Sequence, residues 1–90
     1  MYVKTAKLTF YIPYAMSLKD KRHVCRSLVD KAQHKFNAAI AEVDTQDILQ
    51  TLTIGIAVLS GESSHAKETL ETIINFMDKN TDAELVEIEE

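Results

Sequence analysis

The chain contains one cysteine, one proline, two glycines and no tryptophan among its 90 residues. A lone Cys25 cannot form an internal disulfide, and it has no second cysteine with which to build a thiolate metal site. This cysteine usage agrees with a reducing compartment, where disulfides are rare. We therefore expect Cys25 to be a small core residue, and we expect neither a metal nor another cofactor.

Long apolar runs and a secretory leader are also missing. The most continuous apolar stretch, residues 52–59, is too short to cross a bilayer. Residues 1–7 lack the basic start and the long apolar segment of a signal peptide. The composition, with 46% hydrophobic and 27% charged residues, is typical of an ordinary globular domain. We therefore expect a single cytoplasmic domain over residues 1–90 without membrane contact.

Hydrophobic periodicity predicts the element order βαββαβ. Residues 4–12 alternate between apolar and polar side chains, as a half-buried strand does. Pro13 ends this strand, and Ser17 with Asp20 forms an acidic version of a capping box before a helix that runs to about Phe36. The remaining elements are expected at residues 38–43 and 51–60 (strands), after residues 61–64 (a helix) and at residues 83–88 (a strand). Right-handed crossovers then place both helices on one face of a four-stranded antiparallel sheet, which is the ferredoxin-like α+β sandwich.

Positive charge is concentrated in the first predicted helix. Six of the ten Lys and Arg residues lie in residues 17–36, whereas residues 37–90 carry 2 Lys and 12 acidic residues. The net charge of −4 hides this segregation. On a helical wheel Lys19, Arg22 and Arg26 share one flank of the apolar stripe, and the later lysines of the helix lie on the other. Lys21 points into the apolar sector, where a charge is costly unless it reaches solvent or a carboxylate.

The first three turns of this helix form the candidate binding site. The cations there are Lys19, Lys21, Arg22 and Arg26. They lie where free backbone N–H groups and the helix dipole already attract anions, so phosphate is the expected ligand. We predict binding to structured RNA. One alternative is a homodimeric interaction module whose basic helix binds an acidic protein partner. Another is a solvated face whose long side chains border the core.

The sheet face away from the helices is the second candidate surface. The third strand turns small side chains to that face, and the first strand adds an aromatic residue. A smooth face can pack against a second copy, whereas many antiparallel sheets leave one face solvated. The predicted homodimer-interface residues are Thr53, Gly55, Ala57 and Tyr11.

No residue pattern points to catalysis. The three histidines lack the spacing of metal ligands, and we expect them to be exposed. Glu42, Asp44 and Asp47 are interpreted as acidic residues bounding a turn, because no nucleophile is linked to them in sequence. We therefore predict a protein that is not an enzyme.

One motif resembles a known family. The segment reads Ser17-Leu18-Lys19-Asp20-Lys21-Arg22, and the likeness extends through Phe36-Asn37, Ala41-Glu42-Val43 and Gln46-Asp47. These residues are similar to the YlxP-like family of small bacterial proteins of unknown function. The resemblance implies a ferredoxin-like fold. It also implies a ribosomal or RNA context, because genes of this family often lie near those for translation initiation and ribosome maturation factors.

Overall fold

The computed structural model describes residues 1–90, and it confirms the predicted order of six elements. The strands are β1 (Tyr2–Tyr11), β2 (Ala39–Glu42), β3 (Thr51–Ser60) and β4 (Glu84–Glu89), and the helices are α1 (Leu18–Lys35) and α2 (Ser63–Lys79). Predicted and observed ends differ by at most two residues, because hydrogen bonding rather than side-chain pattern sets where each element stops.

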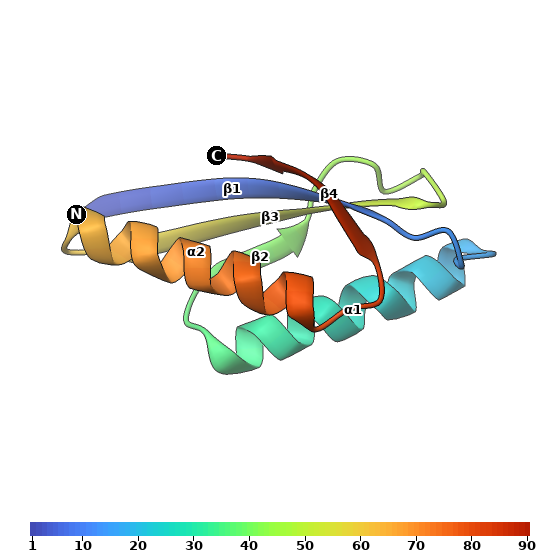
Figure 1. Ribbon diagram of the computed structural model, residues 1–90, viewed down its shortest axis with the longest axis horizontal. Coiled ribbons are helices and arrows are strands. Elements are labelled where there is room, and N and C mark those ends of the chain that lie inside the picture. Colours follow the sequence, from blue (N-terminus) through green and yellow to red (C-terminus); the bar gives the residue numbers. More distant parts are fainter.

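The four strands form one antiparallel sheet in the order β2-β3-β1-β4. The long central pair of β1 and β3 runs in register from Tyr2 opposite Ser60 to Tyr11 opposite Thr51. Both helices lie on the same side of this sheet (Figure 1). The fold is therefore the predicted ferredoxin-like α+β sandwich, with the opposite sheet face turned away from the helices.

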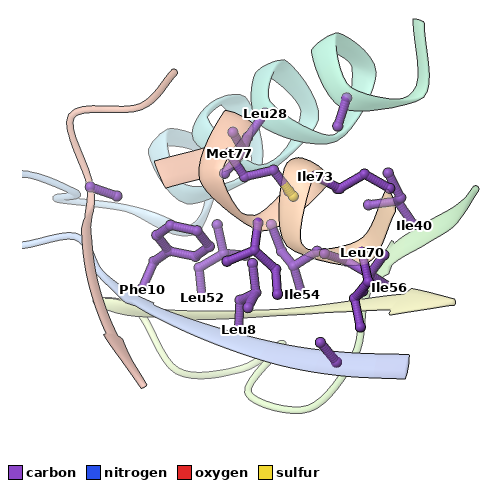
Figure 2. Close-up of a cluster of buried hydrophobic side chains, with 14 of the residues drawn as sticks. Leu8, Phe10, Leu28, Ile40, Leu52, Ile54, Ile56, Leu70, Ile73 and Met77 are labelled. Atoms are coloured by element: carbon purple, nitrogen blue, oxygen red, sulfur yellow. The ribbon is translucent and has the colours of Figure 1, made fainter. Parts of the chain in front are cut away.

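The core lies between the sheet and the helices. Leu8 and Phe10 of β1 are fully buried, as the alternation along that strand predicts. Figure 2 shows the side chains of Phe10, Leu52 and Ile54 directed from the sheet toward Met77 and Ile73 of α2. Helix α1 contributes less, with Leu28 and Ala32 as its buried apolar residues. Neither helix has the length and apolar character needed to span a membrane.

Side-chain hydrogen bonds fix the start of α1. The Ser17 hydroxyl accepts a hydrogen bond from the Asp20 amide at 3.1 Å, and the Asp20 carboxylate accepts one from the Met16 amide at 3.0 Å. The first contact is the one that the acidic capping box predicts, whereas the Asp20 carboxylate binds the amide one residue before the N-cap instead of the Ser17 amide. The Gln50 side-chain amide donates to the Pro13 carbonyl at 3.0 Å. The loop before α1 is therefore tied both to the helix and to the start of β3.

Candidate nucleic-acid interface

Lys21 is buried, so its placement on the RNA-binding surface was wrong. It is 2% exposed, and its ammonium group lies 3.3 Å from the Glu42 carboxylate. The same group donates to the carbonyl oxygens of Thr45 and, at 2.7 Å, Ile48. Residues 43–50, named here the β2–β3 loop, close over the side chain and supply these partners. Lys21 therefore fastens this loop to α1 and cannot reach a phosphate in solution.

The other three predicted cations do lie together on the surface. Lys19, Arg22 and Arg26 are exposed and line one shallow concavity of about 250 Å³ with His23. These four residues are named here the basic patch. Lys19, Arg22 and Arg26 follow one another at intervals of three and four residues, which places them on one face of α1.

The cations of the basic patch have no carboxylate partner. The two ion pairs of the protein join Lys7 to Asp44 and Lys21 to Glu42, and neither involves the patch. The Asp20 carboxylate, which is near in sequence, instead accepts the hydrogen bond from Met16. Like charges held close together without counter-charges repel one another, so an anion bound among them is stabilised.

The remaining cations of α1 lie apart from this patch. The Lys35 ammonium group is placed over the ring of Phe76 at 4.8 Å and over the ring of Phe36 at 5.7 Å. Its side chain therefore packs along apolar surface in a cation–π arrangement. Lys31 lines a different concavity, between α1 and the end of α2. The division of the helix into two basic flanks is thus present in three dimensions.

The predicted dimer strip is interrupted by the β2–β3 loop. Thr53 is 4% exposed, and its hydroxyl accepts a hydrogen bond from the Thr45 hydroxyl at 2.9 Å. The assignment of Thr53 to an exposed interface was therefore wrong. Gly55 is half-buried, and a Cβ atom there would lie 3.0 Å from a methyl group of Val43. Ala57 is half-buried and Tyr11 is exposed, and they lie toward opposite ends of the strip.

An open groove of about 760 Å³ remains on this sheet face. Its floor includes the small side chains Ala39, Ala41 and Ala57. Lys7 and Asp44 close part of its wall with an ion pair of 2.7 Å. The hydrogen bond and the negative charge of Asp44 raise the pKa of Lys7.

Two further reactive side chains, Cys25 and Glu42, make their contacts inside the protein. Cys25 is half-buried, and burial raises the pKa of its thiol, which is therefore protonated at neutral pH. The Glu42 carboxylate faces Lys21 rather than Asp44 or Asp47, so the three acidic residues do not form one cluster. No group of three or more His, Cys, Asp or Glu side chains is placed to hold a metal ion.

Sequence reasoning missed Glu42 as the partner of Lys21, although a signal was present. Ile40 and Glu42 lie two residues apart on one strand, so both point to the same face of the sheet. Ile40 is buried on the face that carries the helices. A carboxylate on that face is near α1, where the sequence places a lysine inside the apolar stripe.

Comparison with known proteins identifies the family of this chain. A model of a family described as proteins of unknown function, DUF503, matches residues 3–90. The chain is also 36% identical over 64 residues to the uncharacterized protein YlxP of Bacillus subtilis (strain 168), which covers 71% of this chain and 70% of that protein. These matches confirm the resemblance seen in the sequence, and they assign no activity. The chain belongs to the DUF503 family of proteins of unknown function.

Proposed function

We propose that this protein binds RNA through the basic patch, and that ribosomal RNA or the ribosomal particle is its partner. The observation that carries the proposal is the exposure of Lys19, Arg22 and Arg26 side by side without a single ion pair. Lys and Arg side chains in this state neutralise phosphates and release counterions, which is the main sequence-independent source of affinity for nucleic acids.

The charge of the remaining surface favours RNA approach from one side of the protein. Residues 37–90 carry 12 acidic and only 2 basic side chains, and the exposed carboxylates of β4 line one edge of the sheet. A phosphate backbone is repelled by these regions and attracted by the patch. Only the α1 side of the molecule therefore offers a favourable approach.

Removal of two patch cations is expected to weaken RNA binding in a salt-dependent way. With three phosphate contacts, the slope of log affinity against log salt is about −2 to −3 for the wild type, at roughly 0.7 to 0.9 per contact. The double variant Arg22→Ala/Arg26→Ala should reduce this slope by about 1.5, because two of those contacts are lost. Fluorescence anisotropy with a labelled fragment of structured ribosomal RNA, titrated at several salt concentrations, measures both quantities.

A matched control removes two positive charges outside the patch. In Lys35→Ala/Lys67→Ala the net charge changes by the same amount, but Lys35 packs on aromatic rings and Lys67 lies on α2. This variant should keep nearly the wild-type salt slope. Equal weakening by the two double variants, or a wild type with no salt-dependent RNA binding, would contradict the proposal.

Co-sedimentation with ribosomal particles, before and after nuclease treatment, distinguishes an RNA partner from an acidic protein partner. A complex that depends on Arg22 and Arg26 and disappears after nuclease treatment supports RNA. A complex that depends on the same residues but survives nuclease supports the protein partner instead, because both ligands respond alike to salt.

Self-association through the open end of the outer sheet face is a second candidate. Val3 and Leu59 face each other in the register of β1 and β3, and they are 55% and 62% exposed. Ala57 lies on the same face, two residues along the strand. Together they form an apolar patch at the end of the sheet that the β2–β3 loop leaves free, and a two-fold axis can bring two such patches together.

The charged substitution Ala57→Arg is expected to abolish this self-association without unfolding the protein. An arginine at the centre of an apolar interface is desolvated without a partner, whereas in the monomer its long side chain reaches water. Analytical ultracentrifugation at tens of micromolar, about the range of weak interfaces, should show a dimer for the wild type and a monomer for the variant. Ile48→Arg, at an exposed apolar residue of the β2–β3 loop, is the matched control. A wild type that sediments as a monomer removes this candidate.

A further inference from the structure

A second concavity adjoins the basic patch. It has a volume of about 500 Å³, within the roughly 300 to 1,000 Å³ that small-molecule sites occupy. It lies between α1 and the turn that joins α2 to β4, and His23 lines both this pocket and the basic patch. We name it the turn pocket. Its lining includes the aromatic ring of Tyr14, the cations Lys31 and Lys79, and the polar residues Asn80 and Asp82.

Several polar groups of the turn pocket have no partner within the protein. Lys31 and Lys79 form no ion pair, and the Asp82 carboxylate takes part in neither a hydrogen bond nor an ion pair. The Asn80 side-chain amide donates to the Phe76 carbonyl at 2.7 Å, which leaves its carbonyl oxygen as a fixed acceptor. Cations, hydrogen-bonding groups and an aromatic ring thus converge on one opening, and a nucleotide offers a complement to each of them.

Tyr14 supplies the aromatic surface on a restrained loop. Its side chain is 48% exposed and lines the turn pocket. The loop is held by a hydrogen bond from the Ala15 amide to the Ile12 carbonyl at 3.2 Å and by the bond from Gln50 to Pro13. A loop whose backbone is already ordered loses little conformational entropy on binding, which favours stacking of a base on its aromatic ring.

We propose that the turn pocket receives one unpaired base of a single-stranded or looped RNA, stacked on Tyr14, while neighbouring phosphates lie on the basic patch. This inference rests on the RNA-binding function proposed above and narrows its ligand. In an A-form duplex the bases are stacked and their edges are hard to reach, so a pocket of this kind selects an unstacked nucleotide. The shared His23 makes the two sites one continuous surface.

The test compares one RNA sequence as a single strand and as a duplex, with Tyr14→Ala against the wild type. Loss of one base stack should weaken single-strand binding by about 10-fold, which corresponds to about 1.4 kcal/mol. The salt slope should stay unchanged, because no phosphate contact is removed. Duplex binding should be the same for both proteins. Tyr14→Phe keeps the ring and should bind like the wild type, and Met16→Ala removes an exposed apolar side chain from the same loop as a control.

The outcomes separate this proposal from the broader one. If Tyr14→Ala binds the single strand as tightly as the wild type while Arg22→Ala/Arg26→Ala binds it more weakly, the turn pocket is not a base site and RNA binding stands. A wild type that prefers the duplex overturns the pocket proposal in the same way. If the wild type binds neither RNA, the proposed function itself fails.

Discussion

Lys21→Met is expected to lower the free energy of unfolding by about 3 kcal/mol, near the low end of the 3 to 5 kcal/mol typical for breaking a buried ion pair. The substitution keeps an unbranched side chain, one atom shorter than lysine, but leaves the Glu42 carboxylate without its cation. The carbonyl oxygens of Thr45 and Ile48 also lose their donor. The expected loss of stability is near the low end of that range because the Glu42 side chain is 24% exposed, so water can reach part of it. Urea unfolding followed by circular dichroism measures the change.

Two variants make this result specific to the ion pair. Lys19→Met removes an exposed lysine two positions earlier and should change stability by no more than about 0.5 kcal/mol. Lys21→Met/Glu42→Leu replaces both charges by apolar groups and should recover much of the loss, because no unpaired charge remains. A cost below about 1 kcal/mol for Lys21→Met would show that the loop does not depend on this lysine.

Phe10→Ala is expected to cost about 3 to 5 kcal/mol, a large part of the 5 to 15 kcal/mol that stabilises a typical domain. Phe10 is fully buried and is the largest of the fully buried side chains. Figure 2 places its ring beside Leu52 at the base of the cluster that meets Met77. Truncation therefore removes apolar contacts and leaves a cavity that the surrounding strands cannot fill.

Tyr11→Ala is the matched control for this core substitution. Tyr11 is the next residue of β1, points to the opposite face and is 42% exposed. Its truncation should cost no more than about 1 kcal/mol, because the ring already contacts water. Thermal unfolding of both variants measures the difference. Equal costs would contradict the assignment of the two faces of β1.

The fold could be predicted from the sequence because its signals are local. Alternation along residues 4–12 and 51–60 identifies the central strands, and the spacing of apolar residues identifies both helices. The cap formed by Ser17 and Asp20 is likewise a contact between near neighbours. With six elements of known type and short connections, few topologies remain possible.

The burial of individual residues at the candidate site depends on contacts between distant segments, which the hydrophobic periodicity of the sequence does not encode. Thr45 has a φ of 58°, in the left-handed region that β-branched residues seldom adopt, so the path of the β2–β3 loop was not predictable from turn preferences. The β2–β3 loop contacts both Lys21 and Thr53, and both residues are buried. Periodicity correctly gave the face to which each side chain points, but it contains no information on which distant segment covers that face.

The β2–β3 loop also bears on the size of any assembly. Because it occupies one end of the outer sheet face, each molecule has a single open patch there, around Val3, Ala57 and Leu59. In the proposed self-association, two molecules related by a two-fold axis would use both patches at once and leave none for a third. Growth through this face would then end at a pair, and the loop would protect the sheet against open-ended stacking.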